Sequence, residues 1–460
     1  MHDRDKDTAL VELAKDGFNV AQFISWSPGV QRHSAIRGFP LDHPFDDVRA
    51  LLEVVGSVNL RTWRHDRLEG CPFIYGVDKA PMAHARIEHF GHEGYRVIAN
   101  ETIDVNDGGV SGVTHGDVTE FAPNSTPRCV EEGDAARLPT VVAWGMLHDV
   151  YGTIAPIPIG SAAARYEWSV HPQAVGYHQR RHVIWQRTDA DPPPCGGEVG
   201  PWPNAFSRFI GDKAYGLMVA SRLGAMVPRT RVITRGGLVF AFGPRPGRRE
   251  DDDIRPWWRT CPRVREPGRH PTWHGYETDP IAMLGRLNSD VASVLIQEPI
   301  PAEYSGAASW RPGEPVLIEG VEGEGEDYML GQEAPTELPG AVVEQVERVV
   351  QGFRHAIESG EIEWVRGSHG VVVVVQLHSR VPDSMYREVE ESWKRVHPGG
   401  GIRAVRSAAE AAQREGVGVA LTRPVGRTSH MAQILDRAEV PWGVSTAQTL
   451  EASGEGVTLR

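Results

Sequence analysis

The sequence predicts a protein of mixed α/β (α+β) class with roughly three domains. Its 460 residues suggest that number at about 150 residues per domain. Strand-like runs separated by glycine turns recur through residues 57–187 and again after residue 205. The tail, residues 402–460, alternates helix and strand patterns, as a small α/β domain does. With 50 Gly and 34 Pro, the chain must contain many turns.

Breaker-rich segments divide this chain into three expected domains. Residues 189–204 are dense in Pro and Gly and indicate a boundary between a block at 1–190 and one at 205–380. The glycine-rich stretch 397–401 precedes a third block at 400–460. Residues 243–275 are charged and breaker-rich, which predicts a long loop or lid.

Charge and cysteine usage exclude several classes of protein. Lys and Arg number 48 against 61 Asp and Glu, a formal net charge of −13, so no general attraction to nucleic acid or to an anionic membrane is expected. No apolar run approaches the roughly 20 residues that span a bilayer, and the first residues carry charges rather than a secretory signal. The four cysteines lie far apart, without metal or disulfide spacing, so we expect reduced thiols and a cytoplasmic protein.

Two parts of the chain share a degenerate pattern. VIANETI, a Ser-Gly turn, a strand with Glu120, the pair Glu167-Trp168 and VIWQ follow one another in the first block. VLIQEPI, Ser305-Gly306, a strand with Glu319, Glu363-Trp364 and VVVQ follow in the same order in the second. This order suits a duplicated domain, although short apolar patterns also recur by chance. The first block is then either a second nucleotide or acceptor site, or a structural half.

Glu363 and Gln376 are candidate ligands of Mg²⁺. The valine run 371–375 predicts a strand buried on both faces, and Gln376 follows it. If that strand forms a hairpin with the strand containing Glu363, a carboxylate and an amide oxygen meet at one edge. Mg²⁺ prefers such oxygens and shares them with nucleotide phosphates. The alternative is a solvated strand end and a turn cap.

Lys213 and His430 are the other two candidates that follow from local pattern. Lys213 opens an amphipathic helix after Gly211, where an ammonium group can pair with polyphosphate oxygens; an ordinary exposed lysine is the alternative. His430 begins a helix, and Thr428 and Ser429 precede it as caps. An imidazole beside helix N–H donors suits a phosphoryl carrier, whereas the alternative is a histidine used only in packing.

Together these segments resemble the phosphoenolpyruvate synthase / pyruvate phosphate dikinase group, which includes rifampicin phosphotransferase. The resemblance covers about residues 205–460 and implies an ATP-grasp domain followed by a swivelling domain that carries a phosphohistidine. It implies ATP and Mg²⁺ as cofactors and assigns the following residues: Lys213, Gln297, Glu298 and Glu326 to nucleotide binding, Glu363 and Gln376 to the metal, and His430 with Thr428 to catalysis.

One departure from this family concerns a phosphate-binding arginine. The family has a Ser-Val-Arg-Ser segment after the lysine, and residues 235–290 contain no such motif. Ser57-Val58-Asn59-Leu60-Arg61 occurs upstream instead. The ATP-grasp domains are therefore expected to be either duplicated or permuted, and Arg61 is a candidate phosphate ligand that completes a composite site. Glu324 replaces a leucine of the family and adds charge near the nucleotide.

The function expected from the sequence is that of an ATP-dependent phosphotransferase of the dikinase type. A phosphoryl group would pass from Mg-ATP through His430 to an acceptor, either a small molecule or a protein. One alternative is an ATP-grasp carboxylate ligase that forms an acyl phosphate. The other is a nucleotide-sensing protein without turnover. The sequence assigns neither the acceptor nor an oligomeric state.

Overall fold

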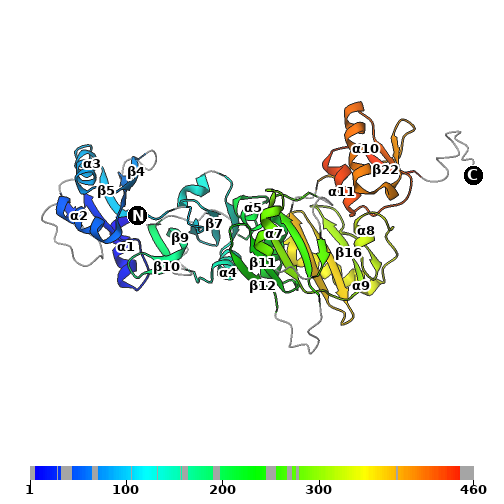
Figure 1. The fold of residues 1–460 in the computed structure, drawn as a ribbon, viewed down its shortest axis with the longest axis horizontal. Helices are drawn as coiled ribbons and strands as arrows, with labels where there is room; N and C mark the ends of the chain where they lie inside the picture. Colours follow the sequence, from blue (N-terminus) through cyan, green and yellow to red (C-terminus); the bar gives the residue numbers. More distant parts are fainter. Residues whose placement is uncertain are drawn as a thin grey trace, which may run out of the picture. The chain divides into compact units, whose positions relative to one another are not determined.

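The computed structural model describes residues 6–27, 30–32, 44–64, 71–104, 106–131, 133–155, 157, 164–189, 197–244, 255–266, 272–275, 279–379 and 382–445. The chain divides into two compact units, Met1–Gly197 and Glu198–Arg460 (Figure 1). The division falls within the Pro- and Gly-rich segment 189–204. Within the described residues, every helix is too short or too polar to cross a membrane.

The first unit contains two antiparallel sheets. Their strand orders are β2-β1-β5-β3-β4 and β10-β9-β6-β7-β8. The elements of this unit are α1 (Lys6–Lys15), β1 (Phe23–Ser27), β2 (Val30–Arg32), α2 (Pro44–Val55), β3 (Val58–Trp63), β4 (Phe73–Val77), α3 (Ala80–His92), β5 (Arg96–Glu101), β6 (Val110–His115), β7 (Val118–Pro123), the 3₁₀ helix η1 (Pro127–Glu131), β8 (Ala136–Pro139), α4 (Thr140–Tyr151), β9 (Ala164–Val175) and β10 (Arg180–Asp189).

Apolar side chains at helical spacing hold the first of these sheets to its helices. Ala83, Ile87 and Phe90 lie three and four residues apart on α3, so they share one face. That face packs with Val48 and Leu51 of α2 in a core cluster that also includes residues of β1, β3 and β5. Burial of this face explains why α2 and α3 fold against the sheet.

The second unit contains two further antiparallel sheets and a small parallel one. Their orders are β12-β11-β15-β13-β14, β17-β16-β18-β19 and β20-β21-β22. The elements are α5 (Ala205–Ile210), α6 (Asp212–Arg222), β11 (Thr230–Thr234), β12 (Val239–Phe242), β13 (Trp257–Pro262), β14 (Thr272–His274), α7 (Pro280–Arg286), β15 (Val291–Gln297), β16 (Ala302–Trp310), β17 (Leu317–Glu322), α8 (Glu326–Met329), α9 (Gly340–Arg354), β18 (Gly360–Gly367), β19 (Val372–Ser379), β20 (Lys394–Val396), η2 (Pro398–Gly400), α10 (Gly401–Glu415), β21 (Val419–Leu421), α11 (His430–Arg437) and β22 (Trp442–Val444).

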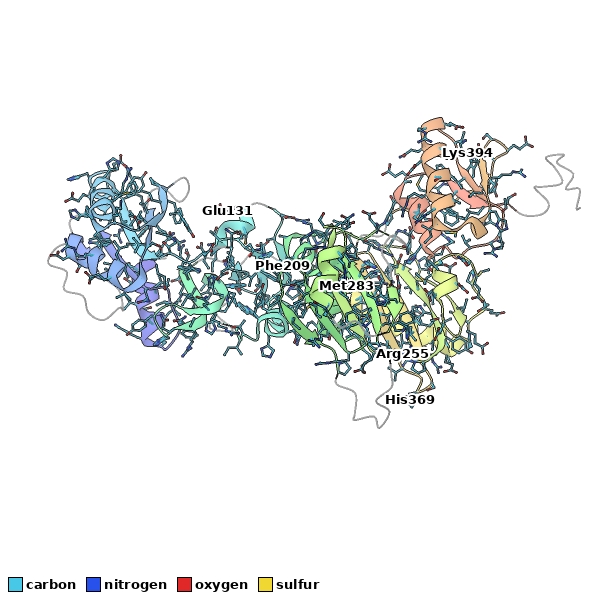
Figure 2. The ribbon with its side chains drawn as sticks, in the orientation of Figure 1. Glu131, Phe209, Arg255, Met283, His369 and Lys394 are labelled. Carbon is cyan, nitrogen blue, oxygen red and sulfur yellow. The ribbon has the colours of Figure 1, made fainter. Side chains whose placement is uncertain are left out.

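Aromatic and aliphatic side chains pack the helices of the second unit onto its sheets. Met283 of α7, labelled in Figure 2, joins Trp258 and Val294 in the core of the first sheet. Trp310 of β16 stacks on Phe353 of α9, with ring centroids 6.0 Å apart. The two sheets are therefore each covered by a helix, and side chains from both sheets line the cavity described below.

The two units repeat one architecture. The order β2-β1-β5-β3-β4 in the first unit corresponds strand by strand to β12-β11-β15-β13-β14 in the second. In the other sheet of each unit, β10-β9-β6-β7 corresponds to β19-β18-β16-β17. Glu167 pairs with Gln186 as Glu363 pairs with Gln376, and a β-bulge follows each pair at the same place. The repeated pattern in the sequence is thus confirmed as a repeated fold. The two units are not permuted relative to each other, because their elements follow the same order along the chain.

The repeat extends through the N-terminal sheet, of which the sequence pattern included only the strand VIANETI, now β5. Phe23 begins β1 and Thr230 begins β11, and the two residues are 207 positions apart. Lys6, the first residue of α1, and Lys213, the second residue of α6, are also 207 positions apart. Lys6 therefore occupies in the first unit the place that Lys213 occupies in the second.

The C-terminal module of the second unit has its own sheet and core. The predicted helices are present as α10 and α11, on either side of β21. Val405, Leu421 and Trp442 belong to a separate apolar cluster. The module begins before residue 400, because β20 (Lys394–Val396) pairs in parallel with β21. The last part of the predicted block, residues 446–460, lies outside the described residues.

Two local expectations require correction. The segment predicted as a loop, 243–275, contributes β13 and β14 to a sheet, because β13 pairs along its length with β15. Residues 245–254 and 267–271 of that segment lie outside the described part. The valine run is a strand but is not buried throughout. Its side chains alternate between buried and half-buried, and Val371 is exposed.

Candidate active site

A cavity of about 330 Å³ lies in the second unit, lined by side chains of both larger sheets and of α11. Seven of the residues singled out in the sequence line it: Lys213, Gln297, Glu298, Glu326, Glu363, Gln376 and His430. Glu324, the expected departure near the nucleotide, lines it as well. The two others, Thr428 and Arg61, lie elsewhere.

Gly211 places Lys213 at the cavity. Its φ of 97° is in the left-handed region, and a Cβ there would lie 2.3 Å from Cys261 Sγ, so no other residue fits. The turn leads into α6, which packs against β19 and has Lys213 in its first turn. Burial and the neighbouring Arg259 lower the pKa of Lys213, and Glu363 partly opposes them. Lys213 makes no hydrogen bond or ion pair with another described residue, so its ammonium group is available to an anionic ligand.

Arg259 on β13 supplies the arginine that the sequence interpretation did not find between residues 235 and 290. It donates from Nη1 to Gln297 Oε1 and to the carbonyl of Val375, both at 3.3 Å. Burial lowers the pKa of Arg259, while Glu363 and Glu326 raise it. Arg259 is also the counterpart of Arg61. Arg259 pairs with β15, the central strand of its sheet, at the position equivalent to the one where Arg61 pairs with β5.

The predicted hairpin between Glu363 and Gln376 is confirmed. The two residues are direct partners in β18 and β19, and Gln376 Nε2 donates to Glu363 Oε2 at 2.6 Å. Burial alone would raise the pKa of Glu363, but His430, Arg259 and Arg265 together lower it well below its usual range. The carboxylate is therefore ionised at neutral pH.

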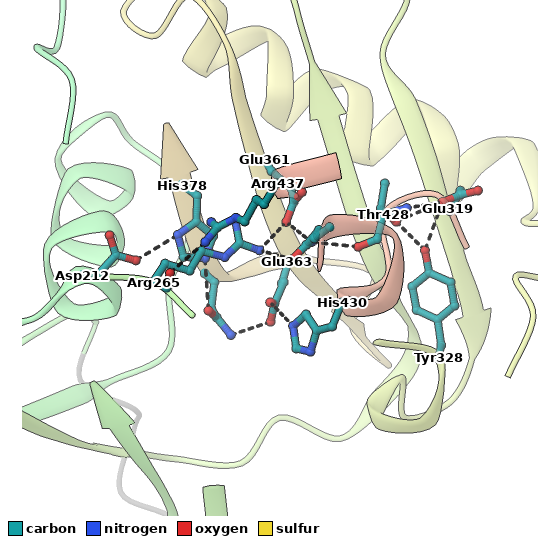
Figure 3. A network of polar contacts seen from close by, with 12 residues as sticks. Asp212, Arg265, Glu319, Tyr328, Glu361, Glu363, His378, Thr428, His430 and Arg437 are labelled. Atoms are coloured by element: carbon teal, nitrogen blue, oxygen red, sulfur yellow. Dashed lines mark hydrogen bonds and ion pairs between the residues drawn. The ribbon is translucent and has the colours of Figure 1, made fainter. Parts of the chain in front are cut away.

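Gln376 also connects Glu363 to the start of α6 through a chain of polar contacts (Figure 3). His378 Nε2 lies 3.2 Å from Gln376 Oε1, and His378 Nδ1 lies 3.1 Å from Asp212 Oδ2. Burial and Arg265 lower the pKa of His378, although Asp212 opposes them. Asp212 precedes Lys213, so this chain fixes the lysine helix against the strand of Gln376.

His430 points toward the Glu363 carboxylate (Figure 3). Ser429 caps α11 by accepting a hydrogen bond from Ala432 N–H at 3.4 Å, which places the imidazole in the first turn. His430 Nε2 lies 3.6 Å from Glu363 Oε1, and its side chain is 18% exposed. His430 Nδ1 is buried without a hydrogen bond among the described residues. The histidine thus reaches the cavity from a separate module.

Thr428 does not line the cavity, which corrects the direct catalytic role expected for it. Its backbone N–H and its hydroxyl both donate to Glu319 Oε2, at 2.8 and 3.0 Å. Its hydroxyl also bonds to that of Tyr328 on α8. Burial and Glu319 raise the pKa of Tyr328, which keeps this phenol protonated. Thr428 therefore holds the C-terminal module against β17 and α8.

A second set of contacts holds the other side of the same module. Arg265 Nη2 donates to Glu361 Oε1 at 2.8 Å and to Gln433 Oε1 at 2.7 Å. Gln433 Nε2 donates to the same carboxylate oxygen at 2.7 Å. Glu361 is two residues before Glu363 on β18, so this contact and the contact of His430 depend on the same strand.

The residues around Glu363 fit a divalent cation whose ligands come partly from the protein and partly from phosphates. Glu363 Oε1 is buried, has no hydrogen bond among the described residues and lies 3.6 Å from His430 Nε2, so a cation would meet this oxygen beside the imidazole. Glu326 and Glu298 add carboxylates to the cavity wall. No cluster of three or more His, Cys, Asp or Glu residues forms a metal site within the described chain.

Arg61 lies in the first unit and lines a different cavity, of about 90 Å³. Its Nη2 donates to Glu167 Oε2 at 2.8 Å and to Gln186 Oε1 at 3.0 Å. Arg165 Nη1 lies 2.6 Å from the other oxygen of Glu167. The cavity with Lys213 is lined by residues of the second unit alone, with Arg259 in the expected place. Arg61 is therefore not among the residues that line the cavity of Lys213, contrary to the expected composite site.

The pair of arginines around Glu167 predicts acid sensitivity. Burial raises the pKa of Glu167, but Arg61 and Arg165 lower it to about 2, from 4.5 for a free glutamate. Its contribution to stability, about 3 kcal/mol, is thus present above pH 4.5 and lost as the pH falls toward 2. We expect the difference in free energy of unfolding between the parent and Glu167→Gln to shrink across that window. Urea titrations measure it, with exposed Glu53→Gln as control; a constant difference would contradict the prediction.

No family model and no curated protein matches the chain. Part of it is similar to solved structures. The macrocyclase MdnB from Microcystis aeruginosa matches with 15% identity and a TM-score of 0.23, over 38% of this chain and 54% of that one. The D-alanine–D-alanine ligase from Bacillus anthracis, complexed with ATP, matches with 14% identity and a TM-score of 0.25, over 51% and 68%. An ATP-grasp ligase from Chryseobacterium gregarium, in complex with ADP and a leader and core peptide, matches with 15% identity and a TM-score of 0.24. This match covers 37% of this chain and 53% of that one.

These likenesses concern the fold only. The chain spans about half the length of the macrocyclase and of the C. gregarium ligase. TM-scores near 0.25 establish neither a shared family nor a shared reaction.

Proposed function

We propose that the second unit is a Mg-ATP-dependent phosphotransferase of the dikinase type, in which His430 takes a phosphoryl group from ATP. The observation that carries this proposal is the position of His430. Its Nε2 stands 3.6 Å from the buried carboxylate of Glu363, in the cavity that contains Lys213 and Arg259. Phosphoryl transfer needs a positioned nucleophile, basic groups and a metal ligand at one place.

Lys213 and Arg259 bind and orient the phosphates. Both cations are largely withdrawn from water, where a charge acts on phosphate more strongly than in bulk solvent. Arg259 is held by Gln297 and by the backbone of β19, so its guanidinium is preorganised. Glu363 and Gln376 would hold a divalent cation, and the chemistry that it would supply is neutralisation of phosphate charge.

His430 acts as the nucleophile through Nε2, the ring nitrogen that faces Glu363, and this nitrogen must carry no proton when it attacks. An N–P bond forms, the bridging P–O bond of ATP breaks, and the departing nucleotide takes the electron pair. Attack at the γ-phosphorus releases ADP and leaves a phosphoryl group on His430. Attack at the β-phosphorus releases AMP and leaves a pyrophosphoryl group, from which water then removes the terminal phosphate. The dikinase type predicts AMP. The modified histidine then leaves the cavity with its module, for which the contacts of Thr428 and Gln433 must open.

The test is to incubate the full chain with Mg²⁺ and ATP labelled at the β- or γ-phosphate. We expect acid-labile, base-stable label on the parent protein, formation of AMP, and less than about 1% of that label on His430→Asn, because no other nucleophile occupies the position. His355→Asn is the matched control, since His355 is exposed at the end of α9.

Each other outcome selects an alternative. Equal label on His430→Asn would contradict the phosphohistidine. Release of ADP without protein label, and only when an amine and a carboxylate are supplied, would establish an ATP-grasp ligase. Nucleotide binding without any turnover would establish a sensor.

A further inference from the structure

Three polar side chains of the first unit form a Ser-His-Asp arrangement. Ser169 Oγ lies 2.6 Å from His171 Nε2, and His171 Nδ1 lies 2.8 Å from Asp107 Oδ2. In an activated serine nucleophile, an imidazole takes the hydroxyl proton and a carboxylate orients the ring, and the same three groups stand here in the same order. The fold brings them together, since Asp107 and His171 are 64 positions apart along the chain.

Local backbone geometry holds each of these groups in place. Ser169 and His171 are two positions apart on β9, so their side chains lie on the same face of the sheet. Asp107 Oδ1 accepts a hydrogen bond from Gly109 N–H at 2.8 Å, which leaves Oδ2 for His171. Gly109 is required there, because a Cβ would lie 2.3 Å from the carbonyl oxygen of Val170. The arrangement is therefore formed without a substrate.

The protonation of this network suits a serine nucleophile. Burial lowers the pKa of His171, although Asp107 opposes this effect, so the imidazole is neutral at pH 7. An ionised Asp107 can only accept, which holds the ring proton on Nδ1 and leaves Nε2 to accept from the hydroxyl of Ser169. Trp185 Nε1 donates to Ser169 Oγ at 2.6 Å. This hydrogen bond favours the negative charge that develops on the oxygen during attack.

The nucleophile and its base line the cavity of about 90 Å³. Ser169 is 0% exposed, so its hydroxyl is withdrawn from bulk water and meets only a group that enters this cavity. A water molecule takes about 30 Å³ in the liquid, so the volume suits a group of a few non-hydrogen atoms, such as an acetyl group. Phe73 and Tyr75 line the same cavity and are 40% and 49% exposed, so it opens to solvent beside these rings. A leaving group can extend past them.

The repeated fold does not require these polar side chains. In the second unit, Val365 and Gly367 of β18 stand at the positions of Ser169 and His171. Val365 lines the larger cavity, so this strand position faces the cavity in both units. The polar network is thus a property of the first unit and not of the shared architecture.

Glu167, at the place of Glu363, is closed to a metal ion. Both of its oxygens are bonded to guanidinium groups, one to Arg61 and the other to Arg165. A carboxylate engaged in this way is not available to Mg²⁺. Arg61 lines the cavity, where its positive charge would stabilise the oxyanion that forms when a hydroxyl attacks a carbonyl group. The first cavity therefore suits acyl chemistry that needs no metal ion.

We propose that the first unit hydrolyses esters of short acyl groups, with Ser169 as the nucleophile, His171 as general base and then acid, and Asp107 as the residue that positions the ring. Ser169 Oγ forms a bond to the acyl carbon while its proton passes to His171 Nε2. The C–O bond to the alcohol breaks, and the alcohol leaves with that proton. Water then attacks the acyl carbon and gives a proton to His171. The bond to Oγ breaks, the carboxylic acid leaves, and the proton returns to Ser169.

Incubation of the full chain with p-nitrophenyl acetate tests this assignment. We expect a burst of p-nitrophenol of about one equivalent per chain, followed by slower turnover, as an acyl-enzyme gives. Peptide mapping by mass spectrometry should place an acetyl group on Ser169. p-Nitrophenyl hexanoate should react about tenfold more slowly or less, because its acyl chain exceeds the cavity.

Variants assign the roles of the three residues. Ser169→Ala should lower the rate about 10³-fold or more, and Asp107→Asn should lower kcat about 10⁴-fold through the wrong tautomer of His171. KM should stay within about twofold for Asp107→Asn, because this residue acts through the ring and does not touch the ester. Ser407→Ala, at an exposed serine of α10, is the control. Urea titrations establish that each variant is folded, and mapping of the parent needs no variant.

Several results would overturn the inference. They are no burst, an acetyl group on a different residue, equal rates for Ser169→Ala and the parent, or equal rates for the acetyl and hexanoyl esters. The outcome is separable from that of the proposed function. Acetylation of Ser169 without label from ATP on His430 would remove the phosphotransferase and leave this site. Label on His430 without acetylation of Ser169 would do the reverse.

Discussion

Replacing Arg259 by methionine lowers ATP-dependent turnover about 10²- to 10³-fold, the usual cost of removing a preorganised charge from a reacting group. Methionine keeps much of the side chain's volume but removes the guanidinium that bonds to Gln297 Oε1 and the Val375 carbonyl. Glu363 would lose one of the cations that keep its carboxylate ionised. The measurement is kcat for AMP formation at saturating Mg-ATP.

Two further variants make this result specific. Arg259→Lys should recover only part of the rate, because an ammonium group cannot reproduce the planar fork of a guanidinium. Arg231→Met is the control, since Arg231 is exposed on β11 of the same sheet. Turnover of Arg259→Met within twofold of the parent would exclude Arg259 from phosphate binding.

The second large effect is expected at Gly216 in α6. A Cβ at this position would lie 2.0 Å from the carbonyl oxygen of Leu377 on β19, which is backbone and cannot rotate away. Alanine favours a helix over glycine by about 1 kcal/mol, but the clash outweighs this gain. We expect Gly216→Ala to lower the free energy of unfolding by about 1–3 kcal/mol, as overpacking does.

The same substitution should also reduce turnover, because α6 carries Lys213 and the partner of His378, Asp212. Gly352→Ala is the matched control in α9, where a Cβ meets nothing within 4 Å. It should raise the free energy of unfolding by about 0.5–1 kcal/mol. Urea titration measures the free energy of unfolding of both variants and of the parent, and kcat measures their turnover. A Gly216→Ala protein as stable as the parent would show that helix and strand separate without cost.

Predictions that depend on neighbouring residues succeeded. The helix after Gly211, the hairpin of Glu363 with Gln376 and the helix that begins at His430 are set by caps, turns and alternation within a few positions. Local order also revealed the repeated sheets, because five short patterns followed one another twice.

Predictions that needed distant strands failed or were absent. Arg259 was overlooked because breaker residues surround β13, although the dipeptide Arg259-Thr260 repeats Arg61-Thr62 and was a usable signal. Pairing with β15, about 35 positions later, makes that segment a strand. Thr428 was assigned to the reaction because it neighbours His430, whereas its partner Glu319 lies 109 positions away.

The sequence by itself determined the mixed α/β class, the repeated strand pattern and the group of residues from Lys213 to His430 that suit phosphate chemistry. It did so because helix starts, hairpins and caps depend on short-range sterics and hydrogen bonds. Only the tertiary structure decided that Arg259 rather than Arg61 accompanies Lys213, that Thr428 is a docking residue, and that Glu167 is closed to a metal ion. Each of these depends on which distant side chains share one buried space, and strand pairing and packing set that arrangement.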